Sequence, residues 1–176
     1  MPVGGGDGDS LSFRMDDYPA RIVVSPGAQP GMTAIGFEVL DERELERLVA
    51  DVEKAGIKVT PGTEAEAADR RATGFVKFND PGGNPVELFY GTVLDHVPVH
   101  TPLVSMFVTG DMGFGHAIVS AEDARTTFEF YVNVLGFIER NTMRSPGGTT
   151  WFMGCNPRHR PWGSCVHGRS SGTSPS

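Results

Sequence analysis

Apolar residues recur at helical spacing in two segments of the chain. Between residues 41 and 55, leucine and valine return every three or four positions, and residues 122–135 repeat the pattern with alanine, aromatic residues and valine. Asp41 stands before the first segment as a candidate N-cap, with an acid three residues later. Gly56 and Gly136 stand where C′ glycines usually end helices. The pattern predicts one amphipathic helix in each segment.

Short runs typical of β-strands surround both helices. Glycine and proline clusters such as residues 79–85 (NDPGGNP) separate the runs, and turn residues of this kind bound strands. Ser120, with Asp123 three residues later, is the predicted N-cap of the second helix. Residues 63–71 are expected to form a loose helical turn. The predicted strands are residues 21–24, 32–40, 57–59, 73–78, 86–90, 115–119, 137–143 and 149–155.

The order of these elements repeats along the chain. Phe37 matches His116 at an offset of 79 residues, and Gly56 matches Gly136 at an offset of 80. Each copy reads as a β-α-β-β-β unit, and the second copy ends before its final strand. Because such a unit cannot bury both faces of its sheet alone, units of this kind pair. The expected fold class is α+β, with mixed, mostly antiparallel sheets and the helices packed on one side of each.

Composition limits the partners and the compartment. The 176 residues carry a net charge of −7, which does not suggest a surface for nucleic acid or anionic membranes. No apolar run approaches the roughly 20 residues of a membrane span, and the first ten residues lack the charged and hydrophobic regions of a secretory signal. Cys155 and Cys165 show no metal-binding or redox spacing. A reduced, cytoplasmic setting is therefore expected.

His116 is the residue in these runs that is most typical of a chemical role. Strand alternation places His116 and Ile118 on one face, and Ala117 and Val119 on the other. A neutral imidazole at the start of an inward-facing row can bind Zn or Fe. The alternative is a histidine at a strand end that makes one backbone hydrogen bond. The residues alone leave both interpretations open.

Four stretches give the chain a resemblance to a known family. They are GFVKFNDPGGNPVELFYG (residues 74–91), the Gly113–His116 junction, the helix end from Phe130 to Phe137, and WFMGCNPRH (residues 151–159). Over residues 14–159 the chain resembles the type I extradiol ring-cleavage dioxygenases of the vicinal-oxygen-chelate superfamily. That family is built from four β-α-β-β-β modules. The chain resembles the tail of the first, all of the second and most of the third, so an incomplete third module is expected.

The resemblance and the composition together divide the chain. Residues 160–176 hold five serines, three glycines and two prolines and show no strand pattern. The expected parts are a disordered N-terminus (1–13), an N-terminal domain made of the tail of the first module and the second module (14–91), a linker (92–110), a partial C-terminal catalytic domain (111–159) and a disordered tail outside the family (160–176).

The resemblance also implies a cofactor and a substrate. The family holds one Fe(II) with two histidines and one carboxylate, and leaves open positions for a bidentate catecholate and O₂. His116 matches the first iron ligand, and the other two ligands belong to the fourth module. Ile118 and Phe152 match residues that wall the ring pocket, although ordinary core packing explains both equally well. The implied substrates are O₂ and a small aromatic diol such as 2,3-dihydroxybiphenyl, in the degradation of aromatic compounds.

One departure from the family concerns a histidine pair that follows Asn-x-Arg. The second histidine of that pair acts as acid or base near the dioxygen, whereas here His159 is followed by Arg160. Arginine stays protonated and cannot do this work. His159 is therefore the remaining candidate catalytic residue.

Three functions fit these observations. The first is a truncated extradiol dioxygenase that is inactive alone, and the specific motifs favour it. The second is a small-molecule-binding module of the same superfamily that needs no metal. The third is an interaction fragment that completes itself by pairing sheets with another chain. An unpaired strand edge in the incomplete third module predicts self-association into homo-oligomers.

Overall fold

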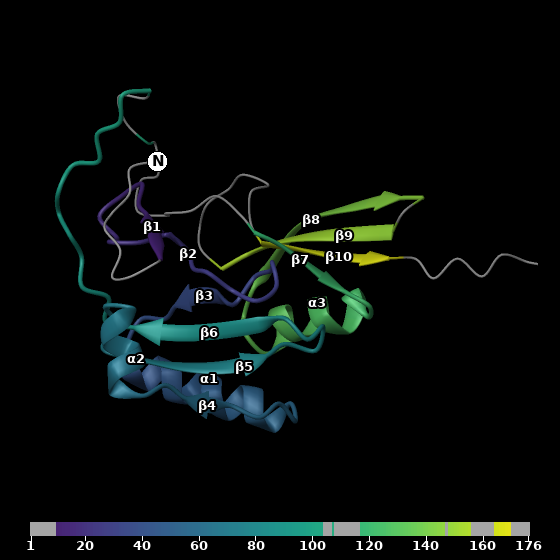
Figure 1. Cartoon of the computed structure of the whole chain (residues 1–176). Helices are drawn as coiled ribbons and strands as arrows, with labels where there is room; N and C mark the ends of the chain where they lie inside the picture. Colours follow the sequence, from purple (N-terminus) through teal and green to yellow (C-terminus); the bar gives the residue numbers. More distant parts are fainter. Residues whose placement is uncertain (1–9, 104–106, 108–116, 147, 156–163, 170–176) are drawn as a thin grey trace, which may run out of the picture.

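The computed structural model describes residues 10–103, 107, 117–146 and 148–155, together with the backbone of residues 164–169. This part of the chain contains three helices and ten strands (Figure 1). The strands form two four-stranded sheets and one two-stranded sheet. No helix among the described residues is long and apolar enough to cross a membrane. The elements are β1 (Leu11–Phe13), β2 (Ile22–Val24), β3 (Ile35–Glu38), α1 (Glu42–Lys54), β4 (Thr60–Pro61), α2 (Glu64–Asp69), β5 (Gly74–Asn79), β6 (Pro85–Tyr90), β7 (Ile118–Ala121), α3 (Ala124–Asn133), β8 (Ile138–Ser145), β9 (Gly148–Gly154) and β10 (Ser164–Arg169).

The two larger sheets share one topology. Their strand orders are β3-β6-β5-β4 and β7-β10-β9-β8. In each sheet the first and second strands of this order run parallel, and the other neighbours are antiparallel. The chain thus contains two β-α-β-β-β units, here called the amino-terminal unit (residues 35–90, which also holds α2) and the carboxy-terminal unit (residues 118–169). The predicted α+β class with repeated units is confirmed.

The main difference from the expected organisation is β10. It pairs with β7 on one side and β9 on the other, within residues 160–176, for which the sequence predicted no strand. The expectation of a disordered tail is therefore wrong for residues 164–169, which supply the fourth strand of the carboxy-terminal sheet. Pairing on both edges, rather than local alternation, holds this strand. The expectation of disorder for residues 1–13 is likewise wrong for β1, which pairs with β2.

Both predicted helices are present, with one difference in their N-caps. Asp41 caps α1 by accepting a hydrogen bond from the Glu44 N–H at 2.9 Å, as predicted. The cap of α3 is Asp123, which accepts from the Thr126 N–H at 3.0 Å. Ser120, the predicted cap, lies inside β7. The helix therefore starts three residues later than the capping-box pattern indicated.

The caps also show how the two units correspond. Asp41 and Asp123 are 82 residues apart, so the strands before the helices correspond with an offset of 82. With this offset Phe37 corresponds to Val119, and both pack in the core. The predicted match of Phe37 with His116 is therefore wrong. A single offset fails because α1 has 13 residues and α3 has 10.

One hydrophobic core joins the two units. Phe37 of β3 packs edge-to-face against Tyr131 and Phe137, with ring centroids 6.2 and 5.1 Å apart. Phe78 of β5 makes the same kind of contact with Phe130 of α3 at 6.1 Å. Because aromatic pairs in this geometry add to the gain from burial, α3 is held against the amino-terminal unit as well as against its own sheet.

The turn between β5 and β6 fits closely against the carboxy-terminal unit. A Cβ added at Gly82 would lie 2.6 Å from the Cβ of Ala121 and 3.1 Å from the Oγ1 of Thr127, so this approach requires glycine. In the same turn, Asp80 accepts a hydrogen bond from the Tyr131 hydroxyl at 3.2 Å. The turn is therefore a second contact between the units.

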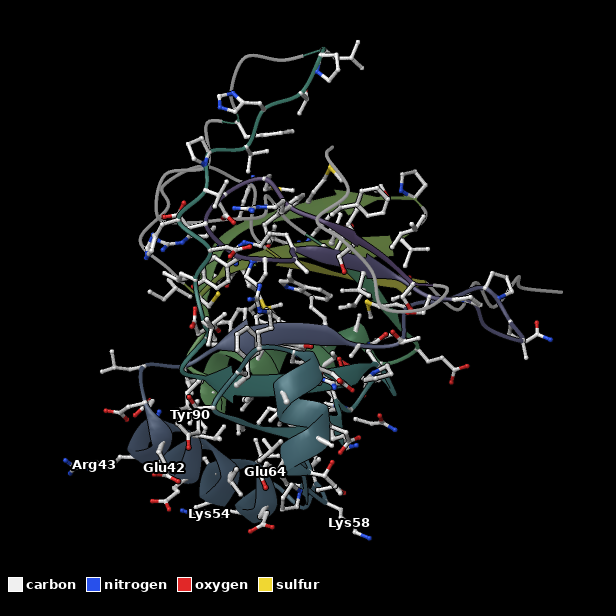
Figure 2. The ribbon with its side chains drawn as sticks, turned by 60° about the vertical axis from the view of Figure 1, so that its left-hand side comes forward. Glu42, Arg43, Lys54, Lys58, Glu64 and Tyr90 are labelled. Carbon is white, nitrogen blue, oxygen red and sulfur yellow. The ribbon has the colours of Figure 1, made fainter. Side chains whose placement is uncertain are left out.

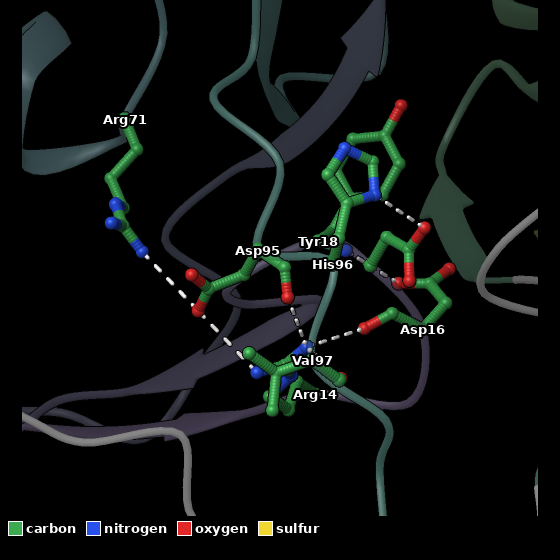
Figure 3. A network of polar contacts seen from close by, with 8 residues as sticks. Arg14, Asp16, Tyr18, Arg71, Asp95, His96 and Val97 are labelled. Atoms are coloured by element: carbon green, nitrogen blue, oxygen red, sulfur yellow. Dashed lines mark hydrogen bonds and ion pairs between the residues drawn. The ribbon is translucent and has the colours of Figure 1, made fainter.

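Arg14 connects the amino-terminal segment to the segment that follows β6 (Figure 3). Its guanidinium donates to the Asp95 side chain at 3.4 Å, to the Asp95 carbonyl at 3.2 Å and to the Val97 carbonyl at 2.9 Å. Arg71 lies 3.6 Å from the same carboxylate. The described part of the predicted linker, residues 92–103, contains no helix or strand. These contacts nevertheless hold its first residues against the fold.

Candidate functional site

The carboxy-terminal sheet has one covered face and one open face. On β7, Val119 is 3% exposed, whereas the next side chain toward the N-terminus, Ile118, is 61% exposed. On β9, Met153 is fully buried and Phe152 is half-buried. Since successive side chains of a strand point to opposite faces, Val119 and Met153 lie on the side packed into the core. Ile118 and Phe152 lie on the open face.

These two open-face residues belong to one row across the sheet. Ile118 is opposite residue 165 of β10, and residue 165 is opposite Phe152 of β9. Neighbouring strands are about 4.8 Å apart, so Ile118 and Phe152 are separated by roughly 10 Å. The structure therefore brings the two predicted ring-pocket residues onto the same face and into the same row.

Asn141 of β8 extends this row, and the sequence pattern did not identify it. It stands opposite Phe152, just after a register shift between Glu139 and Asn141. Such a bulge inserts one residue, so strict alternation counted from Ile138 assigns the later residues of β8 to the wrong face. The row consequently ends in a polar amide, whose Oδ1 accepts a hydrogen bond from the Thr142 N–H at 2.8 Å.

The corresponding row of the amino-terminal unit is polar. It consists of Gly36, Glu87 and Lys77, which face one another in the register of β3, β6 and β5. Glu87 forms an ion pair with Arg70 at 2.7 Å, and Lys77 forms one with Glu66. The hydrogen bond from Lys77 lowers the pKa of Glu66 to about 2. Charged pairs thus occupy this row, and an aromatic ring fits the carboxy-terminal row better.

The metal-ligand prediction falls outside the part of the chain that the structure describes. Neither His116 nor His159 is among the described residues. Within the described residues, no three His, Cys, Asp or Glu side chains gather as metal ligands. The Nδ1 of His96 lies 3.1 Å from the Asp17 carboxylate in an exposed position. A facial triad for Fe(II) needs three protein donors, so the described residues do not form one.

A groove of about 430 Å³ lies between α1 and the β4–β5 side of the amino-terminal sheet. Glu42 and Tyr90 lie close together at its border (Figure 2). Its charged lining residues are Glu42, Glu46 and Glu53, and it is lined by no histidine or cysteine. These carboxylates do not match a set of two histidines and one carboxylate. The groove is therefore not the implied iron site.

Comparison with known proteins agrees with the topology of the two units. The sequence model of the Glyoxalase/Bleomycin resistance protein/Dioxygenase superfamily matches residues 4–88. The chain is 39% identical over 166 residues to the iron-dependent extradiol dioxygenase of Rhodococcus jostii (strain RHA1), covering 88% of this chain and 55% of the relative. It is also 39% identical over 161 residues to the biphenyl-2,3-diol 1,2-dioxygenase of Sphingomonas paucimobilis, covering 87% of this chain and 54% of the relative.

Solved structures show the same relationship. The crystal structure of a catechol 2,3-dioxygenase superposes with a TM-score of 0.82 at 36% identity, covering 93% of this chain and 56% of that protein. A halotolerant catechol dioxygenase superposes with a TM-score of 0.82 at 30% identity, covering 90% and 53%. The chain thus spans about half the length of the curated relatives it matches. The resemblance to extradiol dioxygenases, predicted from four sequence stretches, is confirmed.

Proposed function

Because the chain belongs to the Glyoxalase/Bleomycin resistance protein/Dioxygenase superfamily, we propose that it forms part of a site that binds small aromatic diols for extradiol ring cleavage. The observation that supports this proposal is the row on the open face of the carboxy-terminal sheet. Ile118 and Phe152 present apolar surface there, while the equivalent row of the other unit carries charged pairs. Apolar walls with a few polar groups are typical of sites for aromatic ligands.

The cofactor we infer is Fe(II), since a relative is named an iron-dependent extradiol dioxygenase and His116 matches the family's first iron ligand. Iron in such sites lets electron density pass from the bound diol to O₂. The described residues do not complete a ligand set for it. We therefore expect weak, substoichiometric iron and no ring cleavage by the chain alone.

Proton transfer near O₂ is the role we propose for His159. An imidazole with an ordinary pKa near 6.5 can both accept and donate a proton at neutral pH. Arg160 occupies the next position and stays protonated, so it cannot serve as a second acid or base. The chain therefore carries one such group where the family carries a pair.

Anaerobic reconstitution with Fe(II) tests the metal part of the proposal. We expect less than one iron per chain and no yellow ring-opened product from 2,3-dihydroxybiphenyl after oxygen is added. A His116→Ala variant should lose the weak iron signal, while His96→Ala, at an exposed histidine, should leave it unchanged. Full-stoichiometry iron that disappears in His116→Ala, together with yellow product, would show that the chain builds a complete site.

The apolar row is tested by measuring the binding of 2,3-dihydroxybiphenyl to the chain with anaerobic isothermal titration calorimetry. Ile118 is 61% exposed in the free chain, and an Ile118→Asp variant places there a carboxylate that a bound ring would have to cover, which is costly. We expect its affinity to fall roughly tenfold, since 1.4 kcal/mol corresponds to that factor. Leu103→Asp is the control, because Leu103 is 93% exposed in the linker. Equal affinity of the two variants for 2,3-dihydroxybiphenyl would show that the ligand binds away from the row of Ile118 and Phe152.

A further inference from the structure

The outer edge of β8 is a long strand edge with nothing paired to it among the described residues. β8 spans Ile138–Ser145, eight residues, and ends the order β7-β10-β9-β8, so it pairs with β9 alone. Figure 1 shows β8 at the margin of the sheet, with β9 between it and β10. An unpaired edge of this length presents N–H and C=O groups that can template another strand.

The equivalent edge of the amino-terminal unit is different. There the last strand is β4, which contains two residues, Thr60 and Pro61. A very short strand and a proline are two of the features that block pairing between sheet edges. β8 is four times as long and contains no proline. The two units thus have the same topology, yet β8 lacks the features that block pairing at β4.

The register of β8 on β9 shows which side chains share a face. Glu139 and Thr142 stand opposite Met153 and Trp151 respectively, on the face packed toward α3. The Thr142 hydroxyl donates a hydrogen bond to the Glu139 carboxylate, which agrees with this assignment. Arg144, two residues after Thr142, lies on the same face by alternation.

A second copy of β8 can pair with this edge antiparallel, about a two-fold axis. A two-fold axis perpendicular to the sheet leaves each side chain on its own face. Residues that stand opposite each other across the new strand pair must therefore belong to the same face. When Arg140 is set aside as the bulge residue, an axis through Thr142 satisfies this rule. It places Glu139 of each copy opposite Arg144 of the other, which gives two opposite-charge pairs. An axis through Asn141 also satisfies the rule, but places Glu139 opposite Thr142 and leaves Arg144 without a charged partner.

We propose that the β8 edge binds a second copy of this chain in antiparallel register about Thr142, with two Glu139–Arg144 pairs between the copies. The charges needed for these pairs are available, since Glu139 and Arg144 are exposed and form no ion pair with another described residue. Opposite charges directly across a strand pair favour pairing, and like charges oppose it. This strand edge shares only Asn141 with the open-face row of Ile118 and Phe152, and the proposal does not depend on the proposed ring-cleavage function.

One local contact must change when the copies pair. The N–H of Thr142 donates to the Asn141 side chain at 2.8 Å. In the paired edge the carbonyl of a facing strand can accept from this N–H instead, and the Asn141 amide turns away. The exchange keeps the backbone donor satisfied in both states. This local contact therefore does not oppose association.

Charge-swap variants test the register by analytical ultracentrifugation at low ionic strength. Glu139→Arg places arginine opposite arginine, and Arg144→Glu places glutamate opposite glutamate. Each single variant is expected to dimerise at least roughly tenfold more weakly than the unchanged chain, because both pairs become repulsive. The double variant Glu139→Arg/Arg144→Glu restores both opposite-charge pairs, so it should dimerise like the unchanged chain.

Mixing the two single variants gives the sharper result. In the mixed pair, the arginine introduced by Glu139→Arg faces the glutamate introduced by Arg144→Glu, and the unchanged Arg144 of the first chain faces the unchanged Glu139 of the second. A heterodimer should therefore form where neither variant forms a homodimer. Far-ultraviolet circular dichroism melting of each variant confirms that the fold is retained before association is compared.

Two outcomes would contradict these expectations. An unchanged chain that stays monomeric, or a dimer whose affinity ignores all of these substitutions, would overturn the proposal. Single variants that weaken association without rescue on mixing would overturn the register.

Discussion

Asp80 is a carboxylate that is only 4% exposed, in the turn between β5 and β6. It accepts hydrogen bonds from the Asn84 N–H at 2.8 Å and from the Asn84 side-chain amide at 3.0 Å. The Tyr131 hydroxyl of α3 donates a further bond at 3.2 Å. Buried charges require such partners. The dense turn NDPGGNP was recognised from the sequence, but its contact with a tyrosine 51 residues away depends on how the units pack.

Removing the Tyr131 hydroxyl should weaken the contact between the units. In Tyr131→Phe, Asp80 keeps both bonds from Asn84, so the carboxylate stays partnered and the fold is retained. We expect the free energy of unfolding in urea to fall by about 1.5–3 kcal/mol, the usual value for a hydrogen bond to a charged group. Tyr90→Phe, at the rim of the surface groove, is the control and should change it by less than about 0.5 kcal/mol. An equal loss in both variants would contradict the assignment.

The same tyrosine gives a prediction at high pH. Burial, together with the charge of Asp80, raises the pKa of Tyr131 above its ordinary value. In the unfolded chain a tyrosine ionises near pH 10, so above this pH the unfolded state loses a proton that the folded state retains. The stability of the unchanged chain should therefore fall as pH rises past about 10. The fall should be smaller in Tyr131→Phe, which urea titrations at pH 9 and pH 11 would measure.

Among the elements, those with strong local signals were predicted well. The amphipathic stripe and N-cap of residues 41–55 correctly predicted α1. The turn cluster between β5 and β6 separated these two strands, whose bounds were predicted to within about one residue. β10 was not predicted, because its sequence SCVHGR is short and follows a proline- and glycine-containing stretch. Its pairing partners β7 and β9 come from distant parts of the sequence, and local propensity does not report such pairing. The face of Asn141 was missed for a related reason, since a bulge breaks alternation in β8.

A proline in β10 tests whether this strand holds the carboxy-terminal sheet together. Val166 is opposite Val119 of β7 and Trp151 of β9, so it occupies a central strand. Val166→Pro removes a backbone donor from a central strand. We expect a loss of about 1–3 kcal/mol in the free energy of unfolding, because the carbonyl that accepted from this donor is left unpaired. Ser164→Pro is the matched control, because proline is tolerated at the first residue of a strand. Similar stability of the two variants would mean that β10 does not contribute to the sheet.

For the whole molecule, the shared core makes the two units dependent on each other. The aromatic contacts of Phe37 and Phe78 with α3 cross from one unit to the other, and the buried cluster contains residues of both. Sequence analysis predicted that units of this kind pair, but it did not identify which surfaces meet. The structure shows instead that the helix-covered side of the amino-terminal sheet packs against α3. Alternation along each strand shows which face carries the apolar side chains, but it does not show which element packs against that face.

This arrangement predicts that damage in one unit is felt in the other. Phe37 lies in the amino-terminal unit, while both tryptophans, Trp151 and Trp162, follow residue 150. Trp151 stacks on Phe128 of α3 with ring centroids 5.3 Å apart, so its fluorescence reports the packing of the carboxy-terminal unit. Phe37→Ala should lower the free energy of unfolding by about 3–5 kcal/mol through the lost burial and the cavity. Since the core is shared, the unfolding midpoints from tryptophan fluorescence and from helical circular dichroism should shift together. A tryptophan midpoint that stays in place while the circular dichroism midpoint falls would show two independently folding units, and the shared core would then contribute little to their cooperation.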